Sequence, residues 1–160
     1  MDLKLKGKRA LVTGATRGMG RAIAETLAGE GCNLSICARK EKDVIAAVQS
    51  LQAKGVAAYG AAVDVTRDAD VKDWVAKSAE QLGGLDIIVS NVGAMDLGTG
   101  RASWEKNFNV DVMSLVNMIE AGETFLEAAA KEHGDAAIVA IGSTAAAAIT
   151  NAQSYVAVKG

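Results

Sequence analysis

The sequence contains no proline and has little of several other residue types that define whole classes of protein. It has two cysteines, one histidine and an aromatic content of 4%. Neither Cys32 nor Cys37 stands at metal-ligand spacing from His133, so we expect no metal site, and two thiols without a secretion signal favour reduced cysteines over a disulfide. Average usage would give about eight prolines in a chain of this length, and nothing in the sequence explains their absence.

Long apolar runs and an excess of one charge are also missing. No segment is long and apolar enough to cross a bilayer, and the first residues lack the apolar core of a signal peptide. The 17 basic and 19 acidic residues nearly balance. We therefore expect a cytoplasmic protein with neither nucleic acid nor a membrane as its partner. At this length, with half of its residues apolar, residues 1–160 are expected to form a single domain.

What the sequence does have is a glycine-rich turn between an apolar run and a helix-prone segment. Residues 13–20 read TGATRGMG. The free amides and the positive dipole end of a helix that begins in such a turn attract phosphate. We expect Gly14 to reverse the chain, Gly18 to let a pyrophosphate approach the backbone, and Gly20 to let the helix pack close to the sheet.

The spacing of these glycines differs from the commoner G-x-G-x-x-G of dinucleotide sites. The turn also lacks the Lys-Ser/Thr pair that ends a nucleoside-triphosphate P-loop, which argues against a kinase or an ATPase. Taken alone, the turn leaves open a strand-to-helix connection that binds nothing.

The rest of the chain alternates short apolar runs with amphipathic stretches. Strands are predicted at residues 10–12, 32–39, 56–63, 85–90 and 136–141. Helices are predicted to follow the turn and to cover residues 42–53, 68–82, 104–131 with a possible break near Asn109, and the last segment from about residue 151. This alternation predicts an α/β fold, with a Rossmann-type doubly wound parallel sheet in a three-layer αβα arrangement.

The ligand of such a sheet binds outside the carboxyl ends of the strands. The residues of interest after the predicted strands are the glycine turn, Arg39, Asp64, Asn91, Gly93 and Ser143. In the last segment, Tyr155 and Lys159 are four residues apart and would share one face of a helix. A fixed positive charge beside a phenol favours the phenolate, so Tyr155 could exchange a proton with a carbonyl or alcohol oxygen. Ser143 could hold that oxygen by a hydrogen bond.

Taken together, these residues resemble a classical short-chain dehydrogenase/reductase along the whole chain. The matching motifs, in the order of the family, are the turn at 13–20, Asp64-Val65, SNVG at 90–93, Asn109-Val110, Ser143 and YVAVK at 155–159. The resemblance implies an oxidoreductase that transfers a hydride between a nicotinamide cofactor and a carbonyl or alcohol substrate.

The resemblance also implies a role for each site residue. Tyr155 would be the general acid-base, Lys159 would hold the nicotinamide ribose, and Ser143 would position the substrate oxygen. Asn109 would kink its helix and hold a water in a proton relay behind Lys159. Asp64 and Val65 would contact the adenine, while Asn91 and Gly93 would line the nicotinamide side. The implied cofactor-binding set is Gly14, Thr16, Arg17, Gly18, Met19, Gly20, Arg39, Lys40, Asp64, Val65, Asn91, Gly93, Tyr155 and Lys159.

The choice of cofactor follows from charge at the end of the second strand. An acidic residue there binds the ribose hydroxyls of NAD, whereas a basic one accommodates the extra phosphate of NADP. Ala38 stands where the acid would be expected, and Arg39, Lys40 and Arg17 could converge on one phosphate. We therefore predict NADP(H), with NAD(H) possible. The alternative is that Arg39 and Lys40 are a solvated charge pair that opens a helix.

The sequence departs from the family pattern in four places. SNVG replaces the usual Asn-Asn-Ala-Gly, and the segment between residues 93 and 104 is short. The segment from Ser143 to Tyr155 is one residue short, so Thr144 could take the place of Ser143. Family members continue past the Tyr-Lys helix into two more strands and a substrate-covering loop. We therefore expect a fragment, or the recorded part of a longer chain, that lacks the C-terminal strands.

Other functions stay open beside this prediction. The main rival is a nucleotide-binding module without catalysis, or an inactive fragment. A serine hydrolase that pairs His133 with Ser143 is disfavoured because GSTA at 142–145 lacks the second glycine of a nucleophile elbow. The substrate could be a 3-oxoacyl thioester, a steroid-like ketone, a sugar or a small ketone. The resemblance also implies a homo-oligomer, either a dimer or a tetramer.

Overall fold

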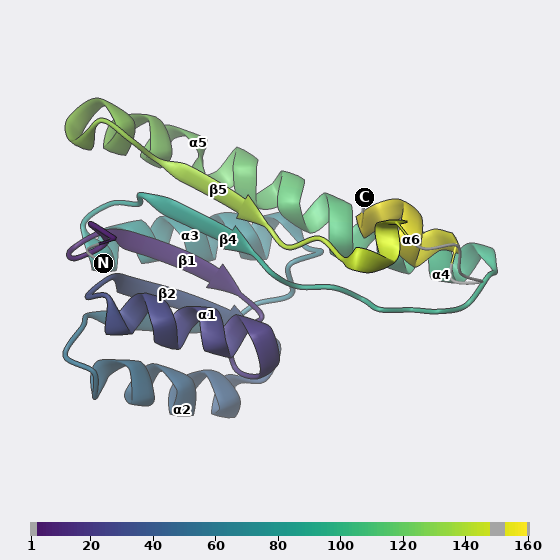
Figure 1. The fold of residues 1–160 in the computed structure, drawn as a ribbon, viewed down its shortest axis with the longest axis horizontal. Coiled ribbons are helices and arrows are strands. Elements are labelled where there is room, and N and C mark those ends of the chain that lie inside the picture. Colours follow the sequence, from purple (N-terminus) through teal and green to yellow (C-terminus); the bar gives the residue numbers. More distant parts are fainter. Residues whose placement is uncertain (1–2, 148–152, 160) are drawn as a thin grey trace.

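A five-stranded parallel sheet forms the centre of the molecule. The computed structural model describes residues 3–147 and 153–159, and its sheet has the strand order β3-β2-β1-β4-β5 (Figure 1). The chain builds outward from β1 to β3 and then returns to the other side of β1, so the strand order reverses between β1 and β4. This confirms the predicted doubly wound sheet. The strands are β1 (Arg9–Thr13), β2 (Asn33–Ala38), β3 (Ala58–Ala62), β4 (Ile87–Ser90) and β5 (Ala137–Ala140).

Helices cover both faces of the sheet. Figure 1 shows α1 and α2 in front of the strands and α3 behind them, with α4 and α6 beyond the strand arrowheads. None of the described helices is long and apolar enough to cross a membrane. The helical elements are α1 (Gly18–Gly29), α2 (Glu41–Gln52), α3 (Asp68–Leu82), α4 (Arg101–Asn107), the π-helix η1 (Phe108–Met113), α5 (Ser114–His133), the 3-10 turn η2 (Thr144–Ala147) and α6 (Gln153–Lys159).

The apolar run of β1 is continuous because both faces of this central strand are buried. Successive side chains of a strand point to opposite faces. Ala10 and Val12 join the apolar cluster under α1 and α2, whereas Leu11 joins the cluster under α3 and α5. A strand buried on both sides therefore reads as an unbroken apolar run rather than an alternating one.

The predicted helix faces are nearly those of the structure. Val71, Trp74 and Val75 of α3 are buried as expected. In α2, the sequence pattern predicts an inward face of Val44, Ile45, Val48 and Leu51, and this is wrong for Ile45, which is 52% exposed. The buried stripe of that helix runs through Val44, Ala47 and Leu51, at spacings of three and four residues that leave the neighbouring position facing solvent.

A buried carboxylate joins the amino ends of β1 and β4 to the end of α5. Asp86 is 1% exposed. Its Oδ2 accepts hydrogen bonds from Arg9 Nε at 2.6 Å and from the Arg9 amide at 2.9 Å, and its Oδ1 lies 2.8 Å from His133 Nδ1. Burial alone raises the pKa of the Asp86 carboxyl, but the hydrogen bonds from Arg9 and His133 outweigh it and bring the pKa to about 2. The cluster therefore stabilises the fold only while Asp86 is ionised.

We predict that Asp86→Asn lowers the free energy of unfolding at neutral pH by about 2 kcal/mol, as follows from a shift of the carboxyl pKa from 3.8 to about 2. Because the folded-state pKa is the lower one, this contribution is complete above about pH 4 and is lost as the pH falls toward 2. Urea unfolding across that range should show a steeper fall for the wild type than for Asp86→Asn. The control is Asp135→Asn, which removes an exposed carboxylate that pairs with Lys8. An Asp86→Asn variant as stable as this control would contradict the prediction.

Candidate functional site

The glycine turn lies at the carboxyl end of β1 and leads directly into α1. Gly14 and Gly18 have φ angles of +65° and +56°, which side chains rarely adopt. A Cβ at Gly18 would meet no atom within 4 Å, so the backbone there is open to a ligand. At Gly20, a Cβ would clash with the Gly14 carbonyl oxygen and the Asn91 amide. Gly20 therefore lets α1 begin against the ends of β1 and β4.

Asn91 ties the end of β4 to this turn. Its side-chain Nδ2 donates to the Thr13 carbonyl at 3.0 Å, and its backbone amide donates to the Thr13 hydroxyl at 2.9 Å. Thr13 itself is fully buried. The Asn91 side chain thus fixes the position of the turn. The family resemblance implies only a place for Asn91 on the nicotinamide side, and this contact with the turn was not predicted.

The predicted phosphate-binding cations are exposed near the end of β2. Arg17, Arg39 and Lys40 are all exposed, as is Met19, and Thr16 is half-buried. Arg39 also influences Asp64, which follows β3. Hydrogen bonds from Thr66 lower the pKa of the Asp64 carboxyl, and the nearby positive charges of Arg67 and Arg39 lower it further. Near the end of β3, the exposed cations Arg39 and Arg67 therefore lie close enough to Asp64 to influence it.

Val65 lies in a different environment from its neighbour Asp64. Its side chain is 8% exposed and belongs to the apolar cluster under α3 and α5. The Val65 carbonyl accepts a hydrogen bond from Asn117 Nδ2 at 3.1 Å. The side chain is therefore part of the core, and little of it is left to contact an adenine.

Lys159, at the end of α6, contacts three oxygen atoms, one from a carboxylate and two from backbone carbonyls. Its Nζ lies 2.7 Å from Asp111 Oδ1, with side-chain exposures of 9% and 0%. The same nitrogen donates to the carbonyls of Ile141 at 3.2 Å and Val92 at 3.4 Å. Lys159 is thereby fixed at the carboxyl ends of β4 and β5, next to the segment that holds the glycine turn.

The structure does not bring Asn109 to Lys159. The helix is interrupted where the sequence predicted it, by the π-helix η1, but Asn109 is exposed. Among the described residues, the carboxylate at Lys159 Nζ is that of Asp111. Gly93 is also explained by this pair, because a Cβ there would lie 3.0 Å from Asp111 Oδ1 and 3.2 Å from Lys159 Nζ.

Tyr155 lies on α6, the helix of Lys159, and Ser143 lies just before η2. Tyr155 is half-buried on α6, which packs against η2. Ser143 precedes η2 and is half-buried, and its hydroxyl accepts the Ala145 amide at 3.1 Å, whereas Thr144 is exposed. Residues 148–152, including the predicted start of the last helix near residue 151, lie outside the described residues.

A buried asparagine that the sequence analysis missed connects α6 to the loop after β4. Asn107 is fully buried, and its Nδ2 donates to Ser154 Oγ at 2.9 Å and to the Asp96 carbonyl at 2.8 Å. Its Oδ1 accepts the Asp96 amide at 3.1 Å. These bonds hold the residue before Tyr155 against the loop. An amide in an amphipathic stretch gives no sequence signal for such a role.

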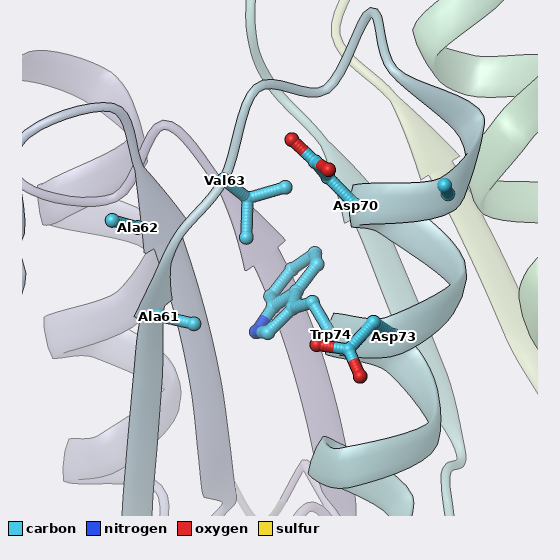
Figure 2. A pocket seen from close by; sticks show the side chains of 7 residues that line it. Ala61, Ala62, Val63, Asp70, Asp73 and Trp74 are labelled. Carbon is cyan, nitrogen blue, oxygen red and sulfur yellow. The ribbon is translucent and has the colours of Figure 1, made fainter.

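A pocket elsewhere in the described residues contains none of the predicted site residues. It lies between β3 and α3, where the Trp74 ring projects toward Val63 (Figure 2). Asp70 and Asp73 extend from the same helix beside it. The pocket is therefore separate from the edge that carries the glycine turn and Lys159.

Comparison with known proteins places this architecture in one family. A family model described as short chain dehydrogenase matches residues 8–160. Isoepoxydon dehydrogenase patN of Penicillium expansum is 37% identical over 126 residues, which cover 77% of this chain and 49% of that protein. The chain thus spans about half the length of the curated relatives it matches.

Solved structures of greater length share the same fold. A short chain dehydrogenase from Burkholderia cenocepacia in complex with NADP is 33% identical, with a TM-score of 0.87 over 97% of this chain and 64% of that chain. The NADH-dependent reductase A1-R', complexed with NAD, is 27% identical, with a TM-score of 0.90 over 99% of this chain and 70% of that chain. With its sheet order, its glycine turn and a family match from residue 8 to residue 160, the chain belongs to the short-chain dehydrogenase family.

Proposed function

We propose that this chain binds NADP(H) and, in the full-length protein, reduces a carbonyl or oxidises an alcohol with Tyr155 as the general acid-base. The observation that carries the proposal is that residues 91–93 connect the glycine turn to Lys159. Asn91 holds the glycine turn, and Val92 accepts a hydrogen bond from Lys159. A dinucleotide with its pyrophosphate on the turn would therefore extend toward Lys159 and Tyr155.

The turn suits a pyrophosphate. The N-cap residue of α1, Arg17, makes no side-chain capping hydrogen bond among the described residues, so no side chain competes for the first amides of the helix. Gly18 leaves open space above the backbone. Amides of Gly18, Met19 and Gly20 would hold the phosphates, and the helix dipole would favour their charge. Backbone atoms near Asp64 and Val65 remain our proposed adenine contacts.

Lys159 and Ser143 would place the reacting groups around Tyr155. When bound, the cofactor supplies or accepts the hydride. Lys159 would hold the nicotinamide ribose, Ser143 would hold the substrate oxygen, and Tyr155 would give a proton to that oxygen or take one from it. We propose that Asp111, rather than the exposed Asn109, is the residue that supports Lys159. The proposed substrates are carbonyl or alcohol compounds, which include 3-oxoacyl thioesters. The homo-oligomer that the family resemblance implies stays a prediction.

The preference for NADP(H) rests on the exposed cations at the end of β2. Relatives with NADP and with NAD share this fold, so the fold itself favours neither cofactor. Arg17 is the N-cap residue of α1 and Arg39 follows β2, and no acidic side chain follows Ala38 directly. A guanidinium binds phosphate through paired hydrogen bonds, which supports the phosphorylated cofactor.

We predict that Tyr155→Phe in the full-length protein lowers kcat by about a hundredfold or more, because general acid-base catalysis contributes about that much. The Kd for NADPH, measured by fluorescence titration, should stay nearly unchanged, since the ring and its packing remain. The matched control is Tyr59→Phe, the other tyrosine of the chain, which lies in β3. Retained turnover in Tyr155→Phe would contradict the acid-base role. A wild type that binds NADPH and oxidises none of it with a broad panel of carbonyls would favour the non-catalytic module.

We predict that Arg39→Ala weakens NADPH binding by about tenfold and changes NADH binding little, because one charge-assisted phosphate contact is worth about 1.4 kcal/mol or more. Titrations with both cofactors at low salt measure this difference. Lys42→Ala provides the control, since Lys42 is an exposed cation of the first turn of α2. Equal affinity of the wild type for the two cofactors would contradict the NADP assignment.

A further inference from the structure

The most exposed large apolar side chains in the described part of the chain lie beside the candidate site. Met95 is 68% exposed, Met19 is 61% exposed and Leu97 is 60% exposed. Met19 belongs to the glycine turn, where the cofactor is proposed to bind, but the proposed function assigns nothing to Met95 and Leu97. Exposed apolar side chains that gather at one place mark a surface that a ligand or a partner covers.

The segment that carries these two side chains, loop 94–98, is attached to the candidate site at both of its ends. It follows β4 and leads to α4 beyond the ends of the strands (Figure 1). The Ala94 amide donates to Asp111 Oδ2 at 3.0 Å. At the other end, the Gly98 carbonyl oxygen lies 3.5 Å from Oγ of Ser154, the residue before the proposed acid-base. The loop therefore extends from the partner of the site lysine to the start of α6.

A buried asparagine fixes the backbone in the middle of loop 94–98. Asn107 is fully buried, and its side chain bonds both the amide and the carbonyl of Asp96, at 3.1 and 2.8 Å. The same side chain donates to Ser154 Oγ at 2.9 Å. Within the loop, Asp96 Oδ1 accepts the Gly98 amide at 3.0 Å. The loop is therefore held as one unit with α6.

The backbone at Met95 has a conformation that its surroundings impose. Its φ angle is +51°, which is uncommon for a residue with a side chain. Such a conformation persists only where the structure around it determines it, and these positions are frequent at ligand sites. Ligand sites are mostly preformed and lined largely by apolar side chains, with a few polar groups that fix orientation. A fixed loop with two exposed apolar side chains fits this description.

We propose that Met95 and Leu97 form the apolar contact surface of the substrate site, and that the substrate is a ketone or alcohol with an alkyl chain near its oxygen-bearing carbon, an inference that rests on the proposed function. The other residues assigned to the substrate, Tyr155 and Ser143, are polar and would hold only its oxygen. An alkyl chain that covers Met95 and Leu97 removes apolar surface of both partners from water. The surface therefore favours long-chain substrates over sugars and small ketones.

Oxidation of methionine in the full-length wild type tests this contact without any substitution. Hydrogen peroxide converts methionine to its sulfoxide, and peptide mass spectrometry follows each site separately. We expect ethyl 3-oxooctanoate, added with NADP+ so that no turnover occurs, to slow the oxidation of Met95 severalfold. NADP+ alone should protect Met19 and leave Met95 accessible. Met95 that is already protected in the ligand-free protein, or that saturating ester leaves unprotected, would overturn the proposal.

Substrate preference measures the same contact by kinetics. Burial of one methylene group is worth about fourfold in binding. We therefore expect kcat/KM of the wild type for ethyl 3-oxooctanoate to exceed that for ethyl 3-oxobutanoate by about tenfold or more. Leu97→Ala, at an exposed position where truncation leaves the fold intact, should reduce this preference severalfold. The control is Ile45→Ala, which shortens a side chain of α2 that is 52% exposed and should leave the preference unchanged.

The outcomes separate the apolar surface from the proposed function. A wild type that prefers the short ester, or an unchanged preference in Leu97→Ala, would refute the surface. If the long ester protects Met95 but neither ester is reduced, the proposed catalysis fails while the surface stands. Turnover that depends on Tyr155, together with an unprotected Met95 and no preference for the long ester, would refute the surface alone.

Discussion

The candidate site depends on three consecutive residues after β4. Asn91 binds the end of β1, Val92 accepts a hydrogen bond from Lys159, and Gly93 leaves room for the pair of Lys159 and Asp111. Because β4 pairs directly with β1, this segment leaves the sheet where the strand order reverses. Two parts of the chain that are more than a hundred residues apart, the glycine turn and α6, therefore contact the same short backbone segment. The spacing between them is set by the sheet rather than by a flexible loop.

Much of the fold follows from local sequence patterns. Apolar runs separated by amphipathic stretches predict parallel strands with helical crossovers, and the right-handed crossover rule limits the order in which they pair. The patterns are less informative at boundaries. Residues 56 and 57 were expected in the third strand, which begins at Ala58. Ile45 was expected in the core but is exposed, because Ala47 takes part in the buried stripe instead. Small residues carry too little apolar signal to define such a stripe beforehand.

The site was predicted in outline because the carboxyl ends of parallel strands share one edge. The positions of Gly14 and Asn91 at that edge follow from this rule, whereas Lys159 was proposed from its spacing to Tyr155 and from the family resemblance. Asn109 and Asp111 show where the rule stops. On a helix, two residues that are two positions apart point to nearly opposite sides, so only one of them can face Lys159. The π-helix η1 also changes the register of this face. In this stretch of helix, Asp111 is the residue whose side chain pairs with Lys159.

Two buried carboxylates at opposite ends of the sheet show how position decides between stability and chemistry. Asp86 at the amino ends of the strands is held by backbone and side-chain donors of Arg9 and by His133. These contacts join β1 to the start of β4 and to the end of α5. Asp111 at the carboxyl ends also pairs with a cation, but its partner Lys159 belongs to the helix of Tyr155. A ligand approaches a doubly wound sheet from the carboxyl ends. Asp86 therefore contributes to the stability of the fold, whereas Asp111 pairs with a lysine that lies one helical turn from Tyr155. The same residue type, with its side chain buried to the same degree, thus lies at both edges of the sheet, but only Asp111 lies at the edge that a ligand approaches.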